Sequence, residues 1–236
     1  MSGDLWVFGY GSLMWHPGFP FTEAHPARLA GFHRAFCIYS MHYRGTPRRP
    51  GLILGLDRGG ACEGVAFRVA PDDAAGVRRY LRERELVTGV YREALLPLSL
   101  SLAAPSSEPA HAEIWAMTYI AERMHPAYAG DLPLAVQARL VRKAKGLTGY
   151  NLDYVLNTEL RLRELGIRER KIERLVGLLG PHLGLGEAAE ARAARRRAMA
   201  ESANDRPLRI AAGRLTPGAR RRFTFRRVLA THRGDG

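Results

Sequence analysis

The sequence predicts an α+β fold in which a small, mixed and largely antiparallel β-barrel or sheet is packed against helices. Two observations lead to this prediction. Segments typical of strands are grouped in the first 120 residues, with one helical segment among them. After residue 130 the spacing of the apolar residues becomes helical. Separate groups of strands and helices are typical of α+β proteins, whose sheets are mostly antiparallel.

Four short segments in the first 70 residues favour strands. Residues 5–9 form an apolar run, and residues 32–41 are rich in aromatic side chains. The apolar runs at 51–56 and 62–69 flank the tetrapeptide DRGG at 57–60. Two such runs around a glycine turn indicate a hairpin.

A helix and two further strands are expected next. Pro71, followed by two aspartates, indicates a helix start, and the helix should run to about Val87 and stop before Gly89. The segments 91–98 and 112–120 are predicted strands, separated by a loop rich in serine and proline.

The remaining segments are helical. The run DLP at 131–133 predicts a cap with proline in the first turn, and the helix should continue through Lys145 until GLTGYN at 146–151 interrupts it. Two apolar stripes then predict two more helices, the first ending at Gly166: Leu152, Val155, Leu156 and Leu160, followed by Ile172, Leu175, Val176 and Leu179.

The positive charge is concentrated at the end of the chain. The formal net charge is +13, and residues 181–236 contribute +8 of it, with 13 arginines, no lysine and five acids. We therefore predict one domain at 4–180, which needs no polyanionic partner, and an Ala/Arg-rich basic extension at 181–236. The run RRRFTFRR in this extension leaves two alternatives, a solvated tail or an arm that contacts nucleic acid or a membrane surface.

Composition and motifs predict a cytoplasmic protein without metal or cofactor. No run of 18 apolar residues and no signal-peptide pattern is found. Cys37 and Cys62 lack metal-ligand spacing and are expected to be reduced, buried thiols. The sequence contains no H-E-x-x-H, no P-loop and no G-x-S-x-G pattern.

The first predicted strand ends in GYGS at residues 9–12. Glycine permits positive φ and lets the backbone approach a ligand closely, so several N–H groups can converge on one anion. The run begins like the dinucleotide fingerprint G-x-G-x-x-G, but Met14 occupies the last glycine position. The pattern therefore favours a carboxylate over a nucleotide phosphate. A tight turn without a ligand is the alternative.

Glu85 continues an apolar stripe of the predicted helix. Val77, Leu81 and Glu85 are spaced by four residues and so share one face, whereas Glu83 lies on another side. A carboxylate on a packed face is either paired with a cation or has a raised pKa, which suits a general acid or base. Glu85 is thus a candidate for proton transfer, and an ion pair with Arg84 or Arg92 is the structural alternative.

Five ordered segments resemble the ChaC family of glutathione-specific γ-glutamylcyclotransferases, over about residues 4–180. Two features depart from the family: Leu52 stands where members usually carry arginine, and the basic extension is outside the pattern. The segments are VFGYGSLMW at 7–15, RGTPRRPG at 44–51, ACEGVAFRV at 61–69, LRERELVTGVY at 81–91 and GLTGYNLDYV at 146–155.

This resemblance implies a lyase that releases 5-oxoproline and Cys-Gly from glutathione, with Glu85 as the catalytic carboxylate. The substrate's own α-amine attacks its γ-carbonyl, so no cofactor is required. Arg44 and Tyr154 are weaker candidates, because Arg44 could instead anchor its loop and Tyr154 could pack in the core. The implied substrate-binding residues are Val7, Phe8, Gly9, Tyr10, Gly11, Ser12, Leu13, Arg44 and Tyr154.

Two other functions are compatible with the same residues. The enzyme could act on other γ-glutamyl peptides or amines, because the chemistry at the γ-glutamyl group would be the same. Alternatively, the chain could be a non-catalytic regulatory protein on the same fold, in which case the Glu85 carboxylate would be dispensable.

Overall fold

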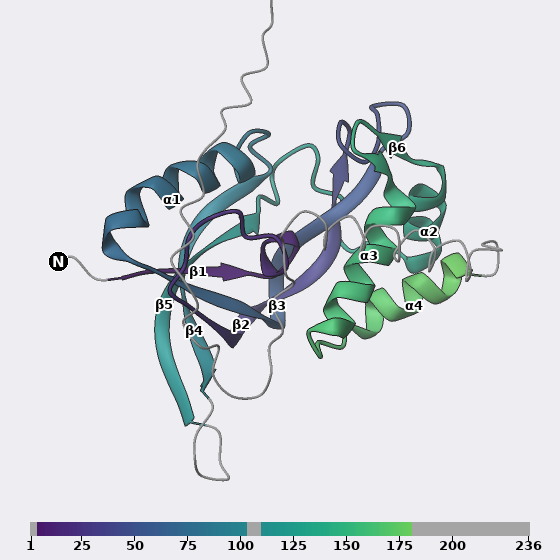
Figure 1. Cartoon of the computed structure of the whole chain (residues 1–236). Helices are drawn as coiled ribbons and strands as arrows, with labels where there is room; N and C mark the ends of the chain where they lie inside the picture. The colour runs from purple at the N-terminus through teal and green to yellow at the C-terminus, as the bar shows by residue number, and fades with distance from the viewer. Residues whose placement is uncertain (1–3, 103–109, 181–236) are drawn as a thin grey trace, which may run out of the picture.

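Five strands form a closed barrel, in the order β1-β3-β2-β4-β5 (Figure 1). The computed structural model describes residues 4–102 and 110–180. All neighbouring strands are antiparallel except β1 and β5, whose parallel pairing at Val7 and Met117 closes the barrel. The α+β class with a mixed, largely antiparallel barrel is therefore confirmed. The strands are β1 (Leu5–Gly9), β2 (Glu23–Ser40), β3 (Gly51–Val69), β4 (Tyr91–Leu102) and β5 (Ala110–Ala121).

The helices lie on two sides of the barrel. Figure 1 shows α1 on one side and the group α2, α3 and α4 on the other. A short 3₁₀ helix, η1 (Ser12–Met14), follows β1, and a two-stranded hairpin of β6 (Lys145–Gly146) and β7 (Gly149–Tyr150) precedes α3. The α-helices are α1 (Pro71–Glu85), α2 (Leu134–Lys143), α3 (Asn151–Glu164) and α4 (Arg170–Leu179).

The hairpin predicted within residues 51–69 is wrong. β3 is one continuous strand, and along most of its length it pairs antiparallel with β2, which begins at Glu23 instead of residue 32. Gly59 and Gly60 both have positive φ, 101° and 70°. They stand opposite the single residue Gly31, so they form a bulge that bends a long strand. A pair of glycines fits a bulge as well as a turn, so the local pattern does not distinguish a bulged strand from a hairpin.

The predicted helices are found, with small differences at their ends. α1 ends at Glu85, two residues before the expected Val87, and α4 buries Ile172, Leu175 and Leu179 as expected. In α3 the buried face is shifted from the predicted stripe. Val155 is buried, but its companions in the core are Asn151, Thr158 and Leu162 instead of the expected leucines.

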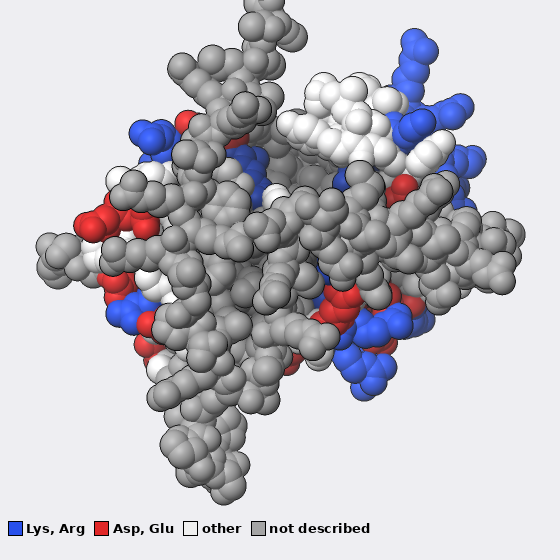
Figure 2. All heavy atoms as spheres, in the orientation of Figure 1, with Lys and Arg blue, Asp and Glu red and all other residues white. Residues whose placement is uncertain are grey.

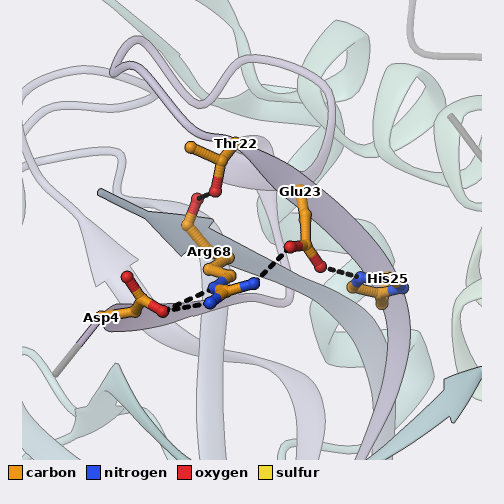
Figure 3. Close-up of polar contacts among 5 residues, drawn as sticks. All are labelled: Asp4, Thr22, Glu23, His25 and Arg68. Atoms are coloured by element: carbon orange, nitrogen blue, oxygen red, sulfur yellow. Dashed lines mark hydrogen bonds and ion pairs between the residues drawn. The ribbon is translucent and has the colours of Figure 1, made fainter. Parts of the chain in front are cut away.

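Arg68 of β3 connects the beginnings of β1 and β2, as Figure 3 shows. Its guanidinium donates to the Asp4 carboxylate, with 2.7 Å from Nε to Oδ2, and also to the Glu23 carboxylate. His25 lies 2.9 Å from the other Glu23 oxygen, and the Thr22 hydroxyl donates to the Arg68 carbonyl at 3.1 Å. Because these groups are partly exposed, we expect the network to fix strand register more than to add stability.

The start of β3 is held by one buried side chain of α3. Asn151 is fully buried, and its amide accepts from the Leu52 N–H and donates to the Leu52 carbonyl, both at 2.7 Å. The side chain of Leu52 is itself fully buried in the core. Leu52, which stands where family members usually carry arginine, is therefore an apolar side chain in a position that suits one.

Two further expectations concern the whole chain. No helix within 4–102 and 110–180 is long and apolar enough to cross a membrane. The basic extension at 181–236, with its run RRRFTFRR, lies outside the described residues.

We expect Asn151→Ala to lower the free energy of unfolding by about 3 kcal/mol, because the substitution leaves a buried N–H and a buried carbonyl without partners. Urea unfolding followed by circular dichroism measures the loss. Asn157→Ala is the matched control, since it has the same chemistry on the same helix at a half-buried position. Equal stability of the two variants would contradict the role assigned to Asn151.

Candidate active site

The turn after β1 is compact and anchored in the core. The Met14 N–H donates to the Gly11 carbonyl at 2.9 Å, and the His16 N–H donates to the Ser12 carbonyl at 2.8 Å. Leu13 and Met14 are buried and hold η1 against the barrel. The positive φ expected for the glycines of this turn is not found: among described glycines with positive φ the first is Gly18, and Gly11 has φ −132°.

A small side chain is nevertheless needed at the end of β1. A Cβ atom at Gly9 would lie 3.1 Å from the Leu13 Cβ, tighter than an ordinary contact. Val7 and Phe8 precede it with fully buried side chains, and the Phe8 carbonyl accepts a 3.1 Å hydrogen bond from Thr118. The side chains of these two predicted contacts thus belong to the core, and the turn itself begins at Gly9.

Arg34 of β2 supports the turn from a buried position. Its side chain is fully buried, and it donates to the carbonyl oxygens of Tyr10 and Glu63, both at 2.5 Å. It also forms an ion pair with Glu169, the residue before α4. A buried guanidinium is tolerated only when its donors are satisfied, and here carbonyls and a carboxylate satisfy them. No local sequence pattern marks Arg34, because its partners are distant along the chain.

Glu85, the last residue of α1, lies beside this turn. Val77 and Leu81 are buried, as the shared face predicted, and the Glu85 side chain is 20% exposed. Burial raises the pKa of the Glu85 carboxyl, and the positive charge of Arg84 opposes this effect. Arg84 is the cation paired with Glu85, with 3.1 Å between Nε and Oε1, whereas Arg92 pairs with Glu122 at 3.8 Å.

Arg84 also connects the carboxylate with the turn. Its Nη2 lies 3.0 Å from the Ser12 hydroxyl oxygen, and its Nη1 donates to the His16 carbonyl at 3.1 Å. One side chain therefore contacts both the predicted acid and the predicted substrate-binding loop. The structural alternative for Glu85, an ion pair at the helix end, is present together with the burial that a proton-transfer group requires.

Three buried tyrosine hydroxyls surround the same region. Burial raises the pKa of Tyr10 and Tyr91 well above the ordinary value, and the pKa of Tyr154 to about 12, with the negative charge of Glu85 adding to each shift. The Tyr91 hydroxyl donates to the Leu54 carbonyl at 2.6 Å, and the Leu54 N–H donates to the Tyr154 oxygen at 3.3 Å. Phenols with such raised pKa values remain protonated at neutral pH, so they can act as hydrogen-bond donors.

Tyr91 was missed as a site residue. It opens β4 six residues after Glu85, and it is the last residue of the family segment at 81–91, which is the signal that could have identified it. Its side chain reaches across to β3, and such a contact between strands is not visible in a local pattern.

Arg44 lies against Tyr154. The guanidinium carbon is 5.2 Å from the centre of the Tyr154 ring, and Nη1 donates to the Thr148 carbonyl at 2.9 Å. Arg44 therefore anchors the 146–150 segment, and its role as a substrate contact stays a prediction. The backbone groups of Leu147 and Thr148 donate to the loop that carries Arg44, at 3.0 Å each.

The Arg44 loop adjoins an exposed apolar surface. Figure 2 shows an uncharged area bordered by lysine and arginine at the end of the molecule where Figure 1 places β6. Tyr150 and Leu147 of the β6–β7 hairpin and the adjacent Tyr43 are exposed, and the Lys145 ammonium lies 4.7 Å from the centre of the Tyr150 ring. This surface borders the Arg44 side of the site.

Other chemistries find little support among the described residues. Cys37 and Cys62 are buried, and burial raises their pKa values to about 12 and about 11, so both are weak nucleophiles at neutral pH. Within 4–102 and 110–180 no cluster of His, Cys, Asp or Glu could hold a metal ion.

The candidate site is defined by converging side chains, and two cavities lie elsewhere. A cavity of about 230 Å³ lies among β2, β3, β4 and β5 and is lined by Phe32, Leu56 and Ile120, among others. A larger one of about 690 Å³ is lined by residues of α3 and α4, including Glu159 and Val176. Neither lining includes a predicted site residue.

Known proteins resemble this chain in sequence and in fold. The chain is 36% identical over 175 residues to the glutathione-specific γ-glutamylcyclotransferase of Escherichia coli (strain K12), covering 74% of this chain and 72% of that protein. It is 35% identical over 179 residues to γ-glutamylcyclotransferase 2-3 of Arabidopsis thaliana, covering 72% and 86% of the two chains.

A solved structure supports the fold. The crystal structure of a γ-glutamylcyclotransferase specific to glutathione from yeast superimposes with a TM-score of 0.66 at 21% identity, covering 78% of this chain and 99% of that chain. The family model described as ChaC-like protein matches residues 5–180. The chain, with its glycine turn after β1 and its acid at the end of α1, therefore belongs to the ChaC-like family.

Proposed function

We propose that this protein is a glutathione-specific γ-glutamylcyclotransferase, a lyase that converts glutathione into 5-oxoproline and Cys-Gly. Relatives with that activity in Escherichia coli and in Mus musculus support the proposal. The structural observation that carries it is the largely buried Glu85 carboxylate, which Arg84 links to the turn after β1. Such a carboxylate can exchange a proton with a substrate held by the turn.

The proposed reaction is an intramolecular ring closure. Glu85 takes a proton from the α-ammonium of the γ-glutamyl group, and the freed lone pair attacks the γ-carbonyl carbon. A new C–N bond forms, the bond to the cysteine nitrogen breaks, and Glu85 returns its proton to that leaving nitrogen. The ring nitrogen keeps one of the three hydrogens of the substrate ammonium. Glu85 carries the other two, one after the other, to the leaving nitrogen, which together with its own hydrogen becomes the ammonium group of Cys-Gly. No electron transfer occurs, and we propose that no cofactor takes part.

The turn supplies the other half of the proposed site. We propose that backbone N–H groups of Tyr10 to Leu13 and the Ser12 hydroxyl hold the α-carboxylate and stabilise negative charge on the reacting oxygen. A five-membered ring closes only when the amine and the carbonyl are folded toward each other, so rigid binding lowers the barrier. The packing of Leu13 and Met14 in the core provides that rigidity.

We further propose that residues 4–180 form the catalytic domain, with 181–236 as an extension outside it, and that the protein acts in the cytoplasm. The family match at 5–180 supports the first boundary. The two buried thiols are compatible with a reducing compartment.

We expect Glu85→Gln to reduce 5-oxoproline formation from glutathione by at least about 100-fold, because an amide cannot accept the proton. Chromatographic measurement of 5-oxoproline gives the rate, and circular dichroism checks the fold. Glu83→Gln on the exposed side of α1 is the matched control and should be as active as the native protein. A Glu85→Gln protein with more than a few per cent of native activity would favour the non-catalytic alternative or another base.

Substrate preference is tested separately. Purified protein given glutathione or γ-glutamyl-alanine should release 5-oxoproline mainly from glutathione. A faster reaction with γ-glutamyl-alanine would point to a cyclotransferase for other γ-glutamyl compounds, and no product from either compound would refute the proposed reaction.

The rate should depend on pH through Glu85. The base must be deprotonated, and burial raises its pKa above the ordinary 4.5 in the substrate-free protein, so kcat/KM should fall as the pH decreases through a value above 4.5. Steady-state rates at glutathione concentrations well below KM, measured from acidic to neutral pH, give this midpoint. A rate that stays constant down to the ordinary glutamate pKa would contradict the assignment.

A further inference from the structure

Arg84 makes contacts with two parts of the proposed site at once. Its Nε lies 3.1 Å from the Glu85 carboxylate, and its Nη2 lies 3.0 Å from the Ser12 hydroxyl oxygen. Its Nη1 reaches the carbonyl oxygens of His16 and Pro17 at 3.1 and 3.3 Å. All three guanidinium nitrogens are thus used, two of them on the segment that follows β1 and one on the carboxylate.

Tyr80, one helical turn before Arg84, strengthens the same connection. The Tyr80 hydroxyl accepts from Arg84 Nη1 at 3.0 Å. It also lies directly over Gly18, which has φ 73° and where a Cβ atom would be 2.2 Å from the hydroxyl oxygen. The last turn of α1 and residues 12–18 are therefore packed as one unit, with Arg84 at its centre.

The contact to Ser12 has a chemical consequence. A hydroxyl has one donor hydrogen and two acceptor lone pairs. Because Arg84 donates to the Ser12 oxygen, the hydroxyl hydrogen is directed toward a different acceptor. A substrate carboxylate is such an acceptor, and a hydroxyl that already accepts from a cation is a stronger donor.

We propose that Arg84 is a positioning residue that couples the proton-transfer carboxylate to the substrate-binding turn, and that it orients the Ser12 hydroxyl as a donor to the substrate carboxylate. This inference rests on the proposed function, since it assigns Glu85 and the turn their roles. It goes further by giving one side chain control over both proton transfer and substrate binding.

The charges around Glu85 allow the effect of Arg84 on the Glu85 carboxyl to be measured. Tyr10 after β1, Tyr91 on β4, Tyr119 on β5 and Tyr154 on α3 all sense the negative charge of Glu85. These groups are neutral phenols at neutral pH, whereas Arg84 is a cation. Loss of the arginine charge should therefore raise the pKa of the Glu85 carboxyl.

Two substitutions separate charge from geometry. In Arg84→Met both are lost, so the acidic limb of the pH profile of kcat/KM should move up by about one pH unit or more, and KM for glutathione should rise about tenfold. In Arg84→Lys the positive charge remains but the planar guanidinium group is lost. The acidic limb should therefore stay near its native pH, while KM for glutathione should rise. Arg79 is an exposed arginine of the same helix, so Arg79→Met should resemble the native protein in both the acidic limb and KM.

A measurement without substrate keeps this test independent of the proposed function. Protein labelled with ¹³C at glutamate carboxyls is titrated by NMR, and the Glu85 signal is identified by its absence in Glu85→Gln. We expect a higher pKa for Glu85 in Arg84→Met than in the native protein and little change in Arg84→Lys. If the native protein forms no 5-oxoproline, the proposed function fails while this comparison still decides whether Arg84 acts on Glu85.

The inference is overturned by any of three results. The first is an unchanged Glu85 titration in Arg84→Met. The second is a native KM in both Arg84 variants, and the third is a pKa displacement in Arg84→Lys as large as in Arg84→Met. Should Arg84→Met fail to fold, as seen by circular dichroism, the Arg84→Lys protein still tests the KM prediction.

Discussion

The partly desolvated carboxylate of Glu85 beside a single guanidinium is the constraint on which the proposed chemistry depends. Burial alone would raise the carboxyl pKa, and a strong ion pair alone would lower it, so their opposition sets the proton affinity of the group. A base that works near neutrality needs such an intermediate affinity, since a weak base removes protons slowly and a strong one is already protonated. The position of Glu85 at the end of α1, in line with Val77 and Leu81, creates both conditions.

Two arginines hold the turn after β1 from different directions. Arg34 binds the Tyr10 carbonyl from β2 and is itself fixed by Glu169 before α4, while Arg84 binds Ser12 and His16 from α1. The turn is therefore connected with helices on both sides of the barrel (Figure 1). A loop that must present N–H groups to an anion gains from such support, because each donor keeps its direction without reorganisation during the reaction.

The sequence allowed the fold class and the main site elements to be predicted because they depend on local patterns. The periodic stripe of α1 placed Glu85 on the packed face, and the glycine turn marked the end of β1. The bulge at Gly59 and Gly60 was read as a hairpin because positive φ fits both, and only the pairing with β2 distinguishes them. Arg34 and Tyr91 were missed for a related reason, since their partners are brought near only by the closed barrel.

The late family segment is important for the site although it lies far from Glu85 in the sequence. Asn151 binds both backbone groups of Leu52, and two residues further along β3 the N–H and carbonyl of Leu54 bind Tyr154 and Tyr91. Residues alternate between the faces of a strand, so fixing Leu52 also fixes the direction of Leu54. The backbone of β3 thus transmits the position of α3 to the tyrosines beside Glu85. A buried leucine at position 52 is sufficient for this task, because the contacts are made by its main chain.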